Sequence, residues 1–145
     1  MHFLIVEDHP EYKVEFVINY LKDKKLNFTY EICKSVNSGL RYFVFNKDKI
    51  DLIILDLGLP IFDDNSRYDK YAGLDIIDEI CIEKNIKNIP IIINSTTNIK
   101  LTDKDIDEKE YFELHYGSDV VIEHVERLTG ETLLDFISKH LKDKI

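Results

Sequence analysis

The chain has 145 residues, of which 44% are hydrophobic and 32% charged, and its formal net charge is −9. This length and composition fit one soluble globular domain with its own core. The acidic balance argues against a nucleic-acid surface, and no apolar run approaches the roughly 20 residues that span a bilayer. The first residues lack the basic region of a secretion signal. We therefore predict a cytoplasmic protein that binds neither nucleic acid nor membrane.

Strand-like and helix-like segments alternate along the chain. The predicted strands are short apolar or β-branched runs, whereas the predicted helices have apolar residues three and four apart. Pro10 suits the first turn of a helix, and Thr129 is a typical helix cap. In chain order, the pattern predicts a strand over 2–6, a helix over 10–22, a strand over 27–33, a helix over 38–45, a strand over 51–56, a polar loop over 61–72, a helix over 73–83, a strand over 89–94, a helix over 102–114, a strand over 119–122 and a helix after Thr129.

This alternation predicts an α/β fold in which a parallel sheet is covered by helices on both faces. Right-handed crossovers leave few topologies, and strand order 2-1-3-4-5 is common at this size. We therefore expect a doubly wound, flavodoxin-like, five-stranded sheet. No linker or internal repeat divides the sequence, so residues 1–145 are expected to form a single domain without an output domain.

Acidic residues end two of the predicted strands. Glu7 and Asp8 follow the first strand, and Asp56 follows the third. In the order 2-1-3-4-5 these strands are neighbours, so the carboxylates should meet at the sheet edge where α/β proteins bind ligands. Ser95 follows the adjacent fourth strand. Crowded carboxylates repel one another, and a divalent cation relieves that repulsion. A single Asp at a strand end more often caps a helix, but three acids with a hydroxyl predict a site.

Four segments of the chain resemble the response-regulator receiver domain of two-component signalling. The similarity covers nearly the whole chain, and its most specific part is an acidic pair after the first strand combined with Asp-x-x-Leu-Pro after the third. The matching segments are FLIVED (3–8), DLIILDLGLP (51–60), GLDII (73–77) and PIIINS (90–95).

The resemblance implies a role for each polar residue at this edge. Asp56 would be the phosphoacceptor, and Asp8 and Asp56 would be side-chain ligands of Mg²⁺. Glu7 would contribute directly or through water, and Gly58 would contribute its backbone carbonyl oxygen. Ser95 would donate a hydrogen bond to the phosphoryl group. Oxygen ligands of this kind suit Mg²⁺, which neutralises charge during phosphoryl transfer.

The sequence departs from the receiver pattern at the fifth strand. Receivers have a Lys at the end of that strand, followed by Pro. With the strand placed at 119–122, Glu123 occupies the Lys position and His124 the Pro position. Loss of such a preorganised cation costs roughly 3 kcal/mol, by analogy with removal of an oxyanion donor. The aromatic switch position is Val120, which cannot swing as a Tyr does. The role of Glu123 is therefore open.

Another cation would be needed to replace the missing Lys. The loop at 61–72 is longer than in receivers and borders the predicted site, so Arg67 or Lys70 could fold back over it. Lys100 lies after the fourth strand and is another candidate. His124 would also serve if it were protonated. The alternative for the loop is a tolerated surface insertion.

Three functions are compatible with these residues. The first is a stand-alone receiver that is phosphorylated on Asp56 by a histidine kinase or phosphotransfer protein and then signals to a downstream protein. Such a receiver is no enzyme beyond its own phosphorylation and dephosphorylation. The second is a pseudo-receiver that only binds protein. The third is a metal-dependent hydrolase with Glu123 as ligand or base. By resemblance, the fifth strand and its flanking helices would contact a partner or a second copy in a homodimer.

Overall fold

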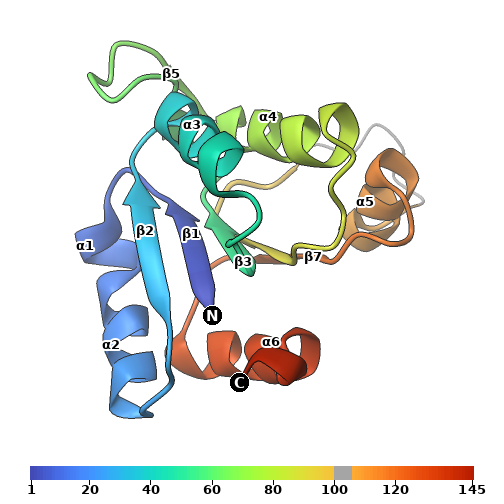
Figure 1. Cartoon of the computed structure of the whole chain (residues 1–145). Helices are drawn as coiled ribbons and strands as arrows, with labels where there is room; N and C mark the ends of the chain where they lie inside the picture. Colours follow the sequence, from blue (N-terminus) through green and yellow to red (C-terminus); the bar gives the residue numbers. More distant parts are fainter. Residues whose placement is uncertain (100–105) are drawn as a thin grey trace.

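The computed structural model describes residues 1–99 and 106–145. A parallel sheet of five strands lies at the centre, in the order β2-β1-β3-β6-β7 (Figure 1). Since the remaining strands β4 and β5 form a separate pair, this is the predicted order 2-1-3-4-5. The sheet strands are β1 (His2–Val6), β2 (Thr29–Cys33), β3 (Leu52–Leu55), β6 (Ile91–Asn94) and β7 (Ile122–Val125).

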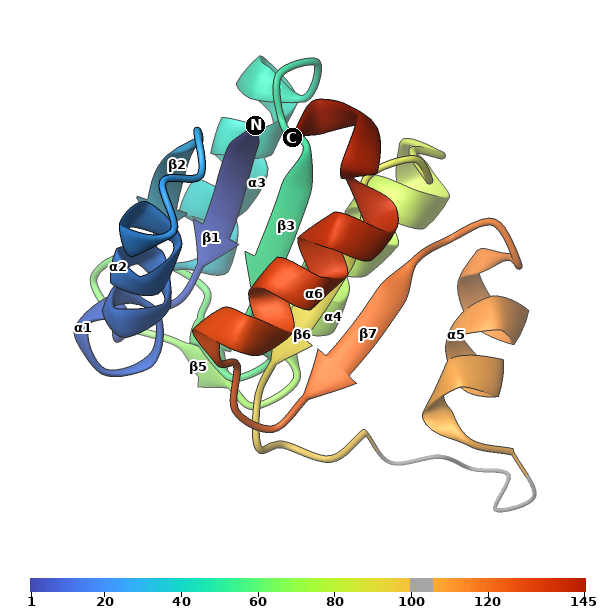
Figure 2. The same cartoon turned by 90° about the horizontal axis from the view of Figure 1, so that it is seen from below.

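Helices cover both faces of the sheet, as predicted. Figure 2 shows α6 (Gly130–His140) crossing one face with α2 (Glu15–Asp23) beside it. The other face is covered by α3 (Val36–Asn46), by α4 (Ala72–Asp78) with its π-helical continuation η1 (Glu79–Glu83), and by α5 (Glu108–Tyr116). A short 3-10 turn, η2 (Lys142–Lys144), follows α6. Within residues 1–99 and 106–145, no helix is long and apolar enough to cross a membrane.

Each central strand contributes side chains to two separate cores. Leu4 and Val6 pack into the core beneath α3 and α4, whereas Phe3 and Ile5 pack into the core beneath α2 and α6. Successive strand residues point to opposite faces, so a strand covered on both sides is apolar along its length, with polar residues such as His2 and Asn94 only at its ends. All residues of β1, β3 and β6 are buried, which explains their continuous Ile, Leu and Val runs.

The helix predicted over 10–22 is broken at Val14. A single turn, α1 (Pro10–Lys13), ends there, and α2 begins at Glu15. Val14 has φ −128° and ψ −35°, outside the helical region, and its side chain is 1% exposed in the core beneath α6. The apolar spacing continues across the break, so the sequence pattern did not reveal it.

The predicted position of the fifth strand was wrong by three residues. The strand expected at 119–122 is β7 at Ile122–Val125, and it pairs with β6 from Ile91↔Ile122 to Asn94↔Val125. β7 is an edge strand and is only half-buried, so it accepts the polar residues Glu123 and His124. The prediction followed the apolar residues Val120 and Val121, but the residues that pair with β6 are Ile122–Val125.

Two further segments differ from the prediction. The predicted loop at 61–72 belongs to an antiparallel hairpin in which β4 (Leu59–Pro60) pairs with β5 (Tyr68–Asp69). The helix predicted over 102–114 is α5, which begins at Glu108 behind the capping side chain of Asp107. Residues 100–105, where that helix was expected to start, lie outside the described residues.

Candidate functional site

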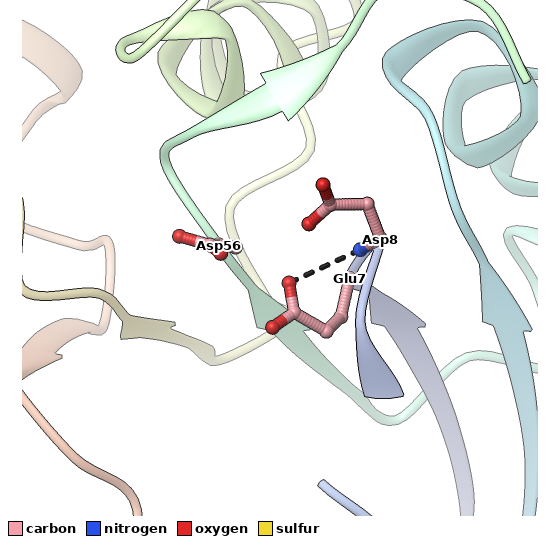
Figure 3. A group of neighbouring side chains, drawn as sticks. All are labelled: Glu7, Asp8 and Asp56. Carbon is pink, nitrogen blue, oxygen red and sulfur yellow. Dashed lines mark hydrogen bonds between the residues drawn. The ribbon is translucent and has the colours of Figure 1, made fainter. Parts of the chain in front are cut away.

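The predicted carboxylates meet at the carboxyl end of the sheet. One oxygen atom from each of Glu7, Asp8 and Asp56 lies within 4.8 Å of the others (Figure 3). The register of the sheet explains this proximity, because Val6 pairs with Leu55 and the amide of Asp56 donates to the carbonyl of Val6 at 3.0 Å. The residues that follow β1 and β3 therefore emerge side by side.

Glu7 is the most buried of these acids, with 2% of its surface exposed. Its Oε2 accepts a hydrogen bond from the amide of Asp8 at 3.1 Å, whereas its buried Oε1 makes no hydrogen bond among the described residues and lies 3.4 Å from the ammonium of Lys13. Burial and the adjacent carboxylate of Asp56 raise the pKa of Glu7 to about 8. Clustered carboxylates with an unsatisfied buried oxygen suit a hard divalent cation, so the residues present fit a metal site.

The raised pKa of Glu7 predicts a stability that depends on pH. The folded metal-free protein keeps a proton up to about pH 8, while the unfolded chain releases it near 4.5. The free energy of unfolding should therefore fall between these pH values, at about 1.4 kcal/mol for each pKa unit. We expect a loss of a few kcal/mol in urea titrations without metal. Glu7→Gln should remove most of it, whereas Glu11→Gln on exposed α1 should keep it. If the free energy of unfolding falls equally with pH in wild type and in Glu7→Gln, the pH dependence does not come from Glu7.

Asp56 is also buried, at 5% exposure, and both its oxygens have partners. Oδ1 accepts a hydrogen bond from the amide of Gly58 at 3.3 Å. Oδ2 lies 2.8 Å from the ammonium of Lys13, which is also 3.4 Å from Glu7 Oε1. Among residues 1–99 and 106–145, Lys13 is the only Lys or Arg whose side chain pairs with these acids.

Sequence reasoning missed Lys13. Burial acts to lower its pKa, but the hydrogen bond and negative charge of Asp56 outweigh burial, so the pKa of Lys13 is raised and the ammonium stays charged. Lys13 lies five residues after Asp8, in a helical turn that starts at Pro10. This short separation from Glu7 and Asp8 is the feature of the sequence that could have indicated Lys13 as their partner.

Ser95 lies where the sequence predicted it, directly after β6. Its amide donates to the carbonyl of Val125 at 3.0 Å, and its Oγ accepts from the amide of Thr97 at 3.1 Å. Ser95 and Lys13 line the same cavity, which has a volume of about 230 Å³. Lys13, which pairs with Asp56, therefore shares a cavity with Ser95, although none of the three acids lines that cavity.

Comparison with solved structures identifies this arrangement of elements. A response regulator receiver domain protein from Clostridium thermocellum is 21% identical, with 99% of this chain and 95% of that chain covered at a TM-score of 0.63. The Mn²⁺-bound response regulator Rcp1 is 20% identical, with 99% and 96% covered at a TM-score of 0.62. The fold is that of a receiver domain. The phosphorylated cyanobacterial phytochrome response regulator RcpA is a further receiver of this fold, 17% identical, with 99% and 96% covered at a TM-score of 0.62. No protein-family model and no curated protein matches the sequence.

The residue at the end of the last strand of this receiver fold is not Glu123. Glu123 pairs with Ile92 inside β7, and its Oε1 lies 3.7 Å from His140 Nε2 and 3.9 Å from Lys139 Nζ, both on α6. Its predicted place beyond the strand end was therefore wrong, because the strand starts three residues later than expected. Since Asn94 pairs with Val125, the position beside Ser95 belongs to Glu126, another acid.

None of the predicted replacement cations contacts Asp56 in the described part of the chain. The ammonium of Lys70 lies over the ring of Tyr71, 5.2 Å from its centroid. Arg67 is exposed in the hairpin. His124 Nδ1 lies 2.9 Å from the carboxylate of Glu108, and its Nε2 lies 2.8 Å from the carbonyl oxygen of Ser95. Lys100 falls outside the described residues.

The hairpin contributes Tyr68 instead of a cation. A Cβ atom at Gly58 would collide with the hydroxyl of Tyr68, so a side chain at position 58 requires Tyr68 to move. Burial and the negative charge of Asp56 raise the pKa of Tyr68, which keeps its hydroxyl protonated. The glycine two residues after Asp56 thus makes room for an aromatic ring from the inserted hairpin.

Proposed function

We propose that this chain is a response-regulator receiver that accepts a phosphoryl group on Asp56 and signals through protein contacts. The observation that supports it most is the buried Asp56, which lies at the carboxyl end of β3 beside Glu7 and Asp8 on a receiver fold. An isolated acid could cap a helix, but a group of acids held 4.8 Å apart or less repels itself. Such a group is better explained by a bound cation and phosphoryl chemistry.

We further propose that Mg²⁺ is the cation. Asp8 and Asp56 would hold it through their side chains, Glu7 directly or through water, and Gly58 through its carbonyl. The fit rests on the oxygen-only donor set and on the buried Glu7 Oε1 that lacks a hydrogen bond. Bound there, the ion would neutralise charge on the phosphoryl oxygens. The likeness to Mn²⁺-bound Rcp1 supports a divalent ion at this edge.

The residues of this chain suit an in-line phosphoryl transfer. An oxygen of Asp56 forms a bond to phosphorus while the phosphorus–nitrogen bond of a phosphohistidine breaks, and the electron pair stays on the imidazole. Ser95 would donate its hydroxyl hydrogen to a phosphoryl oxygen. The phosphohistidine would come from a histidine kinase or a phosphotransfer protein, and a downstream protein would bind the phosphorylated form.

A pseudo-receiver that binds protein without phosphorylation is the second candidate. It is favoured by Glu126, an acid beside Ser95 where receivers place a cation, and by Lys13, which already neutralises Asp56. It predicts partner binding that is unchanged in Asp56→Asn. The hydrolase hypothesis relied on Glu123 as a metal ligand or base, and Glu123 lies against α6 instead.

A single incubation tests the proposed function. The protein is mixed with acetyl phosphate and Mg²⁺, and its intact mass is followed with time. We expect one added phosphoryl group, which is lost on treatment with hydroxylamine because it is an acyl phosphate, and no addition in EDTA. If neither acetyl phosphate nor beryllofluoride modifies the protein at saturating Mg²⁺, the protein-binding candidate replaces this one.

A further inference from the structure

We propose that Lys13 is the cation that contacts the phosphoryl group, supplied by α1 in place of a lysine at the end of the last strand. This inference rests on the proposed phosphorylation of Asp56. It assigns to this chain a phosphoryl-binding residue on a different element from the one that the receiver resemblance implies.

The contacts of Lys13 place its charge on the reacting atoms. The ammonium is 2.8 Å from Asp56 Oδ2 and 3.4 Å from Glu7 Oε1. The next residue, Val14, is buried in the core and fixes the backbone of this turn. The Lys13 side chain itself is 45% exposed. Its ammonium is therefore free to move from the carboxylate of Asp56 to a phosphoryl group bound to that carboxylate.

A cavity on the far side of Lys13 from Asp56 brings Lys13 and the proposed hydroxyl donor Ser95 together. Lys13 and Ser95 line it together, and its volume is about 230 Å³. A phosphoryl group on Asp56 would meet the ammonium of Lys13, and Ser95 lies on the cavity that Lys13 also lines. The strand end that borders the cavity contributes Glu126, whose charge repels phosphate, so the attraction must come from elsewhere.

Arg127 is the rival cation on this cavity. It lines the cavity with Lys13 but is exposed and directly follows Glu126, and no hydrogen bond or ion pair joins it to Asp56. Both side chains are exposed, so water screens both charges, but Lys13 already lies 2.8 Å from Asp56 Oδ2. The geometry therefore favours Lys13.

The transfer itself gives Lys13 two successive partners. With acetyl phosphate, an Asp56 oxygen bonds to phosphorus as the phosphorus–oxygen bond to acetate breaks, and the electron pair leaves with acetate. The Asp56 carboxylate loses its charge on forming this bond, and the negative charge now lies on the phosphoryl oxygens. The Lys13 ammonium should follow that charge, exchanging its contact with Asp56 for one with the phosphoryl group.

Charge removal at Lys13 should change two measurements in opposite directions. Lys13→Met should slow phosphorylation by acetyl phosphate roughly 100-fold, the size expected for loss of one preorganised donor. The same variant should bind Mg²⁺ about fivefold more tightly, because no ammonium competes for the carboxylates. Lys13→Arg should restore most of the rate. Lys22→Met, an equal charge change on exposed α2, should alter neither. Unchanged phosphorylation in Lys13→Met overturns the proposal, and weakening of both measurements indicates a structural role instead.

A measurement on the wild-type protein avoids any folding defect of the variant. Nitrogen-15 NMR of the lysine ammonium groups should show the Lys13 signal shifting when beryllofluoride binds with Mg²⁺. A bound mimic with an unmoved Lys13 signal overturns the proposal, as does a larger rate loss in Arg127→Met than in Lys13→Met. If wild type binds no mimic and accepts no phosphoryl group, the proposed function fails, which is a different result from a phosphorylated protein that ignores Lys13.

Discussion

Asp56→Asn is expected to lower phosphoryl incorporation by at least roughly 1,000-fold, since removal of a nucleophile abolishes most of a covalent mechanism. The amide is nearly the same size as the carboxylate, so the buried position after β3 is retained. Its oxygen can still accept the hydrogen bond from the amide of Gly58. What is lost is the negatively charged oxygen that, in the proposed function, attacks phosphorus. Intact-mass spectrometry after incubation with acetyl phosphate and Mg²⁺ measures the effect.

A matched control separates this effect from a general change of charge. Asp64→Asn makes the same substitution in the exposed hairpin loop, where Asp64 accepts a hydrogen bond from the amide of Ser66. It should be phosphorylated at the wild-type rate. Ser95→Ala should fall between the two, because it removes only one donor to the phosphoryl group. A hydroxylamine-sensitive phosphoryl group on Asp56→Asn would mean that the acceptor is another residue.

Gly73→Ala is expected to destabilise the protein by about 3 kcal/mol, at the upper end of overpacking effects. Gly73 lies in the first turn of α4, and its amide donates to the carbonyl of Leu57 at 2.8 Å. An added Cβ would overlap the carbonyl oxygen of Asp56 and lie 2.8 Å from Leu57 Cα. Both are backbone atoms, of Asp56 and of the residue after it, and cannot rotate away. Thermal unfolding should show a Tm lower by roughly 10 °C.

Gly39→Ala is the comparison for this substitution. Gly39 also lies in a helix, α3, but its added Cβ would crowd only the Val6 side chain, at 3.0 and 3.2 Å, with Ile76 Cδ1 at an ordinary 3.7 Å. Those methyl groups can adjust, and alanine favours the helix by up to about 1 kcal/mol. The net change should therefore be within about 1 kcal/mol of zero. Equal Tm values for Gly73→Ala and wild type would show that α4 can move away from Asp56 without cost.

The central strands and the carboxylate group were predictable because both follow from local pattern. Strands covered on two faces are apolar along their length, and the runs at 3–6 and 52–55 show it directly. A parallel sheet places all strand ends at one edge, so the acids that follow β1 and β3 had to meet once the order was known. The separation of at most 4.8 Å between their oxygens confirms that prediction.

The fifth strand and the long loop were less predictable for a physical reason. An edge strand is half-buried, so its pairing register is set by backbone hydrogen bonds to β6 and not by the apolar residues at 120 and 121. The hairpin of β4 and β5 is likewise held by backbone pairing between short segments of mixed polarity. Neither feature leaves a strong hydropathy signal.

The sequence by itself determined the layered sheet, the order of its strands and the meeting of Glu7, Asp8 and Asp56. Short runs of apolar residues indicate which strands are buried and where each strand ends. Only the tertiary structure decided which cation joins those acids. Lys13 reaches Asp56 across 43 positions of sequence through a long side chain on a helix broken at Val14. Such a contact depends on how two elements are oriented in space, and no local pattern of residue types encodes that orientation.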